Sequence, residues 1–230
     1  MIKIEKTEVH GFEAAIRGMR NPMESWENSD SMICPDSAGF EDCHATGMCQ
    51  RKDDNFENAV FCVGENDLKL MKKLSTAGND HAKYLRMINV TCDITAPLYY
   101  WKEFDTYKVG TVANSCSTMH KIHAKEFTLN DFSHEHLLNA FEANLELLVS
   151  SLNAARDMFL ETKDKAFWWQ MIQLLPSSYN QKRTIQMNYQ VLKNMYHARK
   201  NHKLDEWREF CKWVETLPYK ELITGDTEKE

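Results

Sequence analysis

A group of small polar side chains around a cysteine is the part of this sequence best suited to chemistry. The stretch 96–120 begins with an apolar and aromatic run and ends in Asn114, Ser115, Cys116, Ser117 and Thr118. A thiol among small neighbours is a candidate nucleophile, provided that a nearby cation favours its thiolate form. Lys108 and His120 are near in the sequence. The pattern therefore predicts a binding surface that carries either a reactive thiol or an inert cysteine.

A second group of potential metal ligands lies earlier in the chain. Its members follow the spacing C-x8-C-H-x4-C-x12-C and are Cys34, Cys43, His44, Cys49 and Cys62. Thiolates and imidazoles bind zinc, but structural zinc sites are usually built from close C-x2-C pairs, which this spacing lacks. We expect reduced cysteines in an irregular insertion at about 21–63 and no metal, with a metal site as the alternative.

We expect residues 184–200 to form a single helix with a basic residue near its C-terminal end. Arg199 lies in the last turn of that helix, where a cation complements the helix dipole. Asn188 and Asn194 are six residues apart in the same segment and flank Tyr189 and Met195. Two such asparagines are either solvated or in contact with a ligand.

Hydrophobic periodicity indicates which elements position these groups. Alternation of apolar and polar residues predicts strands at 2–11 and 87–95. Helical spacing predicts helices at 12–20, 65–77, 98–107, 135–162, 163–173 and 204–216. Residues 21–63 carry many loop-forming residues, and a loop of this length is often functional.

Composition narrows the classes of protein to consider. The 230 residues carry a formal net charge of −6, which disfavours non-specific binding of DNA or RNA. Only 8 Gly and 5 Pro are present, so we expect a helix-rich chain. The N-terminus lacks the pattern of a signal peptide, and no apolar run is long enough for a membrane span. We therefore expect a cytoplasmic protein with no membrane partner.

Taken together, these segments resemble the flavin-dependent thymidylate synthases. The family signature is an Arg-His-Arg triplet followed after seven residues by Ser, with Ala-Pro and Arg-Gln before it. Here Ala96-Pro97 is present, Thr106-Tyr107-Lys108 stands at the triplet, and Cys116 follows after seven residues. Further positions of the family pattern are matched by His81, Leu175-Pro176, Asn188, Asn194, Arg199 and Trp207. The resemblance covers most of residues 65–215.

The resemblance implies a fold and a reaction. The fold is α+β, with a mostly antiparallel central sheet, packed helices and a helical lobe, and it forms one domain over residues 1–230. Family members are homotetramers whose FAD and substrate sites lie between subunits. The implied reaction is the reductive methylation of dUMP or a related pyrimidine nucleotide. FAD is the cofactor, and methylenetetrahydrofolate and NADPH are the co-substrates.

The resemblance also implies roles for individual residues. FAD is expected to contact His81, Thr106, Tyr107, Lys108, Asn188 and Asn194. The nucleotide is expected to contact Glu103, Asn114, Cys116, Thr118 and Arg199. Two of these residues are the expected catalytic groups. Arg199 would stabilise negative charge on the pyrimidine ring, and Cys116 would add to C6 of the base.

Several cations of the family pattern are replaced in this chain. Lys102-Glu103 stands where Arg-Gln is expected, and Thr118 and Ile172 stand where the family has arginines. Each lost cation removes a charge-assisted hydrogen bond worth about 1.5–3 kcal/mol to a nucleotide. Two hypotheses follow. The first is a flavoenzyme acting on a pyrimidine nucleotide, and the second is a non-catalytic or repurposed member that binds a nucleotide or a protein partner.

Overall fold

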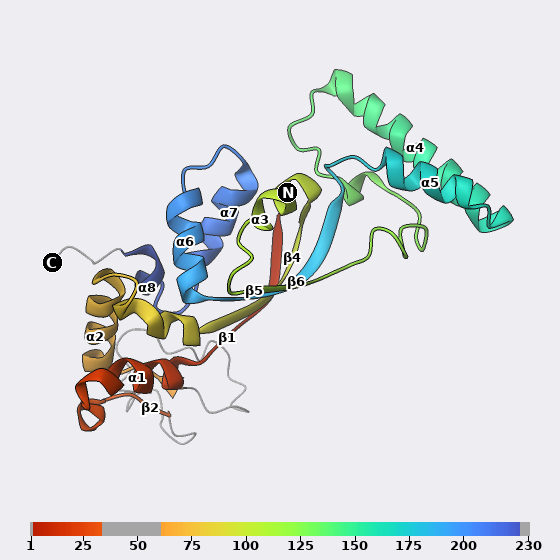
Figure 1. Cartoon of the computed structure of the whole chain (residues 1–230). Helices are drawn as coiled ribbons and strands as arrows, with labels where there is room; N and C mark the ends of the chain where they lie inside the picture. Colours follow the sequence, from red (N-terminus) through yellow and green to blue (C-terminus); the bar gives the residue numbers. More distant parts are fainter. Residues whose placement is uncertain (1, 34–60, 226–230) are drawn as a thin grey trace, which may run out of the picture.

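An antiparallel sheet of four strands forms the centre of the molecule, in the order β1-β4-β6-β5 (Figure 1). The computed structural model describes residues 2–33 and 61–225. The sheet is made of β1 (Lys3–His10), β4 (Asn89–Pro97), β5 (Thr111–Ser115) and β6 (Asn180–Asn188). Two short strands, β2 (Met32–Ile33) and β3 (Phe61–Cys62), pair separately. This architecture confirms the expected α+β class with an antiparallel sheet.

The pairing of β4 with β6 divides the sheet into an apolar face and a polar face. It runs from Asn89↔Asn188 to Pro97↔Asn180. Because side chains alternate along a strand, Cys92 and its partner Ile185 point to one face, and both are buried. Asp93 and its partner Thr184 point to the other face and form a hydrogen bond of 2.7 Å.

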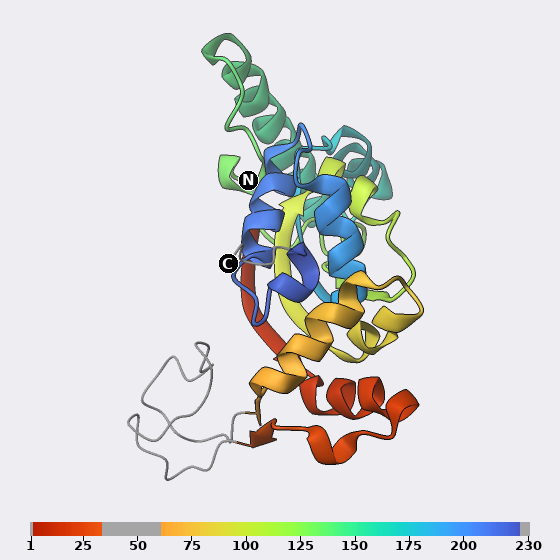
Figure 2. The same cartoon turned by 90° about the vertical axis from the view of Figure 1, so that its left-hand side faces the viewer.

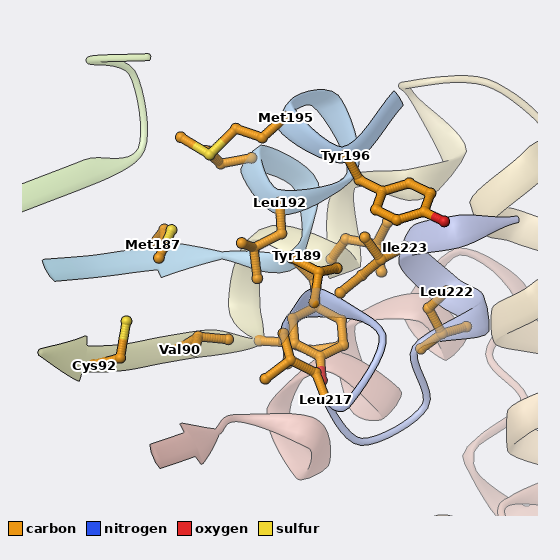
Figure 3. Packing of buried hydrophobic residues seen from close by; sticks show 14 of the residues in the cluster. Val90, Cys92, Met187, Tyr189, Leu192, Met195, Tyr196, Leu217, Leu222 and Ile223 are labelled. Atoms are coloured by element: carbon orange, nitrogen blue, oxygen red, sulfur yellow. The ribbon is translucent and has the colours of Figure 1, made fainter. Parts of the chain in front are cut away.

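Helices α3 (Leu98–Phe104), α6 (Tyr189–Arg199) and α7 (Asp205–Val214) cover the apolar face, which we call the helical face of the sheet. The short helix α8 (Glu221–Thr224) packs against α6 and α2. Figure 3 shows Leu192 and Met195 of α6 directed toward Val90, Cys92 and Met187 of the sheet. These side chains belong to the larger of two clusters of buried apolar residues.

The opposite, open face carries a network of charged and hydroxyl side chains. The Asp93 carboxylate lies 2.9 Å from Lys182 Nζ and accepts the hydrogen bond from Thr184. The Thr184 and Lys182 hydrogen bonds lower the pKa of Asp93 below its ordinary value. The open face is therefore polar and suited to contact with solvent or a polar partner.

A helical hairpin, which we call the arm, projects from the sheet (Figures 1 and 2). It consists of α4 (Asn139–Thr162) and α5 (Lys165–Leu174). Asp164 is the N-cap of α5, and its carboxylate accepts a hydrogen bond from Ala166 N–H. The arm packs around a second, smaller cluster that includes Leu145, Leu152 and Met171. It corresponds to the expected helical lobe.

The N-terminal side of the molecule is held together by a buried ion pair. It joins α1 (Phe12–Arg20) to α2 (Glu65–Thr76), which packs against the 3₁₀ segment η4 (His81–Met87). Arg20 Nε donates to Asp67 at 2.6 Å, and the Asp67 side chain has no exposed surface. The hydroxyls of Ser29 and Ser31 also donate to Asp67, each at 2.6 Å. One carboxylate thereby joins both helices to the residues that lead into β2.

The expected helix at 184–200 is wrong in its first part. Residues up to Asn188 belong to β6, where Ile185 and Met187 are buried and Thr184 and Gln186 are exposed. Asn188 is the N-cap of α6, and its Oδ1 accepts from Val191 N–H at 3.0 Å. The two asparagines therefore do not share a helix, because the capping residue lies at the junction between strand and helix.

Other boundaries also differ from those expected. The helix expected at 135–162 begins only at Asn139, so Leu137 and Leu138 lie before it and are exposed. Strand β5 was not expected. In the described residues, no helix is long and apolar enough to cross a membrane.

We predict that Asp67→Asn lowers the free energy of unfolding by about 3–5 kcal/mol, because it leaves the buried Arg20 guanidinium without a counter-charge. Chemical denaturation measures this loss. The matched control is Glu209→Gln, which removes an exposed ion pair of 2.7 Å with Lys212 and is expected to cost about 1 kcal/mol or less. Equal losses in the two variants would contradict the role assigned to Asp67.

Candidate functional site

Three of the predicted site residues meet on the helical face of the sheet. Arg199, in the last turn of α6, donates from Nη1 to the Glu103 carboxylate of α3 at 2.7 Å. Its Nε donates to the Tyr107 hydroxyl at 2.9 Å. The Arg199 side chain is 19% exposed and the Glu103 side chain 35% exposed. We call Glu103, Tyr107, Arg199, His202 and Trp207 the arginine cluster.

Aromatic rings enclose the Arg199 guanidinium. Its centre lies 4.9 Å from the Trp207 ring and 5.5 Å from the Tyr107 ring. Trp207 Nε1 donates to the same Glu103 oxygen that Arg199 binds, at 3.1 Å. A guanidinium held by two hydrogen bonds and two rings loses little further freedom when a ligand arrives.

His202 completes the arginine cluster through a defined tautomer. The backbone N–H of Leu204 donates to His202 Nδ1 at 3.2 Å, so Nδ1 carries no proton. In the neutral ring the proton then lies on Nε2, which is 3.3 Å from the Glu103 carboxylate. One oxygen of Glu103 therefore faces three donors. The Glu103 carboxylate partly neutralises the Arg199 guanidinium, and this weakens the attraction of Arg199 for an anionic ligand.

Two other predicted residues line a separate pocket of about 240 Å³, which we call the open-face pocket. Cys116 and Thr118 follow β5 there, opposite Tyr179, Asn180 and Lys182. Two hydrogen bonds fix the backbone at Cys116. Cys116 N–H donates to Lys182 O at 2.9 Å, and Gln181 Nε2 donates to Cys116 O at 2.8 Å. Cys116 is exposed. A small ligand in this pocket would therefore have access to the thiol.

The lysines of this pocket are paired with carboxylates. Lys125 binds Asp131, and this hydrogen bond raises the pKa of Lys125. Lys182 binds Asp93, and this hydrogen bond raises the pKa of Lys182. Both lysines stay charged, but each shares its charge with an acid. The pocket is thus polar and nearly neutral, unlike a strongly cationic phosphate site.

The arginine cluster and this pocket lie on different faces of the sheet. The Arg183 guanidinium lies 4.2 Å above the Trp101 ring of α3, so Arg183 and its partner Ser115 face the helices. By alternation, Asn114 and Cys116 point to the open face, where Asn114 lies beside Thr184. Within a single chain, Cys116 and Arg199 therefore lie on opposite faces of the sheet.

The predicted flavin-contacting residues lie around the start and outer side of α6. His81 is exposed on η4, which packs against α6, and Asn194 is exposed on α6 itself. Thr106 and Lys108 are exposed in the turn after α3. At Gly110, where φ is +81°, a Cβ would come within 3.1 Å of Asn188 Nδ2. The turn 106–110 thus lies against the N-terminus of α6.

Sequence reasoning did not find every residue of these sites. His202, Lys125, Asp131 and Tyr179 were not singled out, because each is far in sequence from its partner or carries no local motif. Cys34, Cys43, His44 and Cys49, weighed as metal ligands, lie outside the described residues, whereas Cys62 is half-buried. Among the described residues, no group of three or more His, Cys, Asp or Glu is arranged to hold a metal.

We predict that iodoacetamide at pH 8 labels Cys116 at least tenfold faster than Cys92 or Cys211. Burial raises the pKa of Cys92 to about 12 and that of Cys211 to about 11, so both stay protonated and shielded. Cys116 is exposed. Peptide mapping by mass spectrometry separates the three sites. Equal labelling of Cys92 and Cys116 in the folded protein would contradict this arrangement.

Comparison with known proteins gives similarity in structure only. No family model and no curated protein matches the sequence. Two solved structures of flavin-dependent thymidylate synthase ThyX from Helicobacter pylori, both with FAD and dUMP, superpose with a TM-score of 0.64. One is 16% identical and covers 97% of this chain and 98% of its own. The other is 15% identical and covers 98% of each chain. The chain therefore has the fold of these synthases over nearly its whole length.

Proposed function

We propose that this chain is a divergent member of the flavin-dependent thymidylate synthase family that binds FAD and a pyrimidine nucleotide. The observation that carries the proposal is the end-to-end similarity to two ThyX structures with FAD and dUMP. The arginine cluster supports it, because Arg199 is partly exposed and held in one orientation. The proposed reaction is the reductive methylation of dUMP or a related nucleotide, with methylenetetrahydrofolate and NADPH.

The residues around α6 fit a flavin by the chemistry of their donors. Asn188, Asn194 and His81 offer amide and imidazole groups for the heteroatoms of the ring, and Lys108 offers a cation for the pyrophosphate. Asn188 already uses its oxygen to cap α6, so its amide nitrogen is the group left for a ligand. When bound, reduced FAD would supply the hydride.

In the proposed substrate site, Arg199 donates hydrogen bonds to the pyrimidine ring and stabilises negative charge that develops on it. Tyr107, Trp207 and Glu103 hold the guanidinium in place. Cys116 and Thr118, with Asn114 on the same face, contact the nucleotide from the open-face pocket. The thiolate of Cys116 is the proposed nucleophile toward C6 of the base: its addition moves the C5–C6 π electrons into the ring carbonyl as an enolate, and its later departure from C6 restores the double bond.

The separation of these residues supports a site shared between subunits. Arg199 lies on the helical face of the sheet, where it binds Glu103 of α3, and Cys116 lies on the open face. A single nucleotide can contact both only if a second chain supplies one of them. This is the arrangement expected for a homotetramer whose active sites lie between subunits.

A repurposed binding protein is the second candidate, and a specific observation favours it. The Arg199 charge is paired with Glu103, and both lysines of the open-face pocket are paired with aspartates. Such pairing weakens the recognition of an anionic nucleotide. This candidate predicts a folded protein that binds a nucleotide or a protein partner without turnover.

We predict that the purified protein takes up FAD, seen as a shift in the flavin absorbance, and releases tritium from dUMP labelled at C5. Arg199→Ala is expected to lower tritium release at least 100-fold, since it removes a charge-assisted contact worth about 3 kcal/mol. Arg208→Ala, which removes an exposed arginine bound to Asp205, is the matched control and should keep full activity. FAD uptake without tritium release would favour the repurposed protein, and failure of both would reject the proposal.

A further inference from the structure

The arginine cluster leaves hydrogen-bonding groups unused on both of its charged members. One oxygen of Glu103, Oε2, faces Arg199, Trp207 and His202. The other oxygen, Oε1, makes no hydrogen bond within the described residues, and neither does Arg199 Nη2. A ligand would therefore meet a free carboxylate oxygen beside free guanidinium N–H groups.

These groups follow one another in a fixed order. Nη1 and Nη2 of Arg199 share one carbon, and Nη1 lies 2.7 Å from the Glu103 carboxylate. Nη1 carries two N–H groups, of which the bond to Glu103 uses one. The order along this edge of the cluster is therefore donor, donor, acceptor, made by Arg199 Nη2, Arg199 Nη1 and the Glu103 carboxylate.

The edge is held in place and is still accessible. Arg199 Nε donates to the Tyr107 hydroxyl at 2.9 Å, and the guanidinium carbon lies 4.9 Å from the buried Trp207 ring. The Arg199 side chain is 19% exposed and the Glu103 side chain 35% exposed. A ligand that matches this edge binds without paying to order the two side chains.

Of the two pyrimidine bases cytosine and uracil, cytosine matches the whole edge. Its O2 and N3 are acceptors, and its exocyclic amino group on C4 is a donor. Arg199 can donate to O2 and N3, and Glu103 can accept from the amino group, as acidic side chains do in contacts with cytosine. Guanine offers cytosine the same order of groups in a base pair.

Uracil matches only part of the edge. Its order is acceptor, donor, acceptor, so that N3–H would face an Arg199 N–H and O4 would face the Glu103 carboxylate. A shift by one position pairs two groups but leaves Nη2 and one carbonyl oxygen without a partner. A glutamine, which the family pattern has at position 103, could donate to O4, whereas a carboxylate only accepts.

We propose that the arginine cluster binds the base of a cytosine nucleotide in preference to uracil, with Arg199 donating to O2 and N3 and Glu103 accepting from the amino group. The inference rests on the proposed function in taking Arg199 as the residue that contacts the base, and it names Glu103 as the residue that sets the base preference. dUMP is then the weaker ligand, bound through two of the three contacts. When the Cys116 thiolate bonds to C6 of cytosine, the displaced π electrons come to rest on N3, to which Arg199 donates, and they return when the S–C6 bond breaks.

Isothermal titration calorimetry of the full chain, with FAD present, tests the preference with dCMP and dUMP. The wild type is expected to bind dCMP at least about tenfold more tightly, since it makes one more hydrogen bond to a charged group. Glu103→Gln is expected to lower this ratio of dissociation constants at least about tenfold, because the amide can donate to O4 of uracil. The matched control Glu209→Gln, at an exposed position of α7, should keep the wild-type ratio.

A change in the nucleotide gives a second test that a folding defect does not imitate. Replacing the amino group of dCMP by hydrogen is expected to weaken binding to the wild type at least about tenfold, and the loss should be at least about threefold smaller in Glu103→Gln. Equal losses in the two proteins, or a wild type that binds neither nucleotide, would overturn the proposal.

The two proposals fail in different ways. A wild type that prefers dUMP and releases tritium from it overturns the cytosine preference and keeps the proposed function. A wild type that prefers dCMP without turnover of either nucleotide supports the cytosine preference and favours the repurposed binding protein over the enzyme.

Discussion

The pairing of β4 with β6 is the constraint on which the rest of the molecule depends. Because side chains alternate along both strands, the pairing gives one face of buried apolar residues and one face of polar residues. The apolar face binds α3, α6 and α7 and thereby brings Arg199 to Glu103. The polar face leaves Cys116 beside an open pocket. A change of one residue in register would exchange the two faces.

The same division explains how the candidate site differs from what the family pattern implies. Where the pattern has a neutral glutamine, this chain has Glu103, and its carboxylate holds Arg199, Trp207 and His202 together. The cluster is therefore rigid and close to neutral. The pocket beside Cys116 is also close to neutral, since Lys125 and Lys182 bind Asp131 and Asp93. In both places the cations share their charge with carboxylates.

The sequence predicted elements whose periodicity is uninterrupted, such as α1, α2, β4 and α7. It failed at 184–200, because Ile185, Tyr189, Leu192 and Tyr196 also match helical spacing although a strand ends at Asn188. It missed β5, whose residues are mostly exposed at a sheet edge and show no apolar alternation. The contact between Glu103 and Arg199 spans 96 positions and became visible only once the helices were placed. Local patterns carry no information about such distant partners.

The central claim is that Arg199 and Cys116 serve one site from two chains. Mixing two impaired variants, Arg199→Ala and Cys116→Ala, tests it most directly. If the site is shared, subunit exchange creates some sites that contain both native residues, and the mixture releases tritium from labelled dUMP well above either variant alone. If each chain builds its own site, the mixture stays at the average of the two variants. That result, or a wild type without tritium release, would contradict the account.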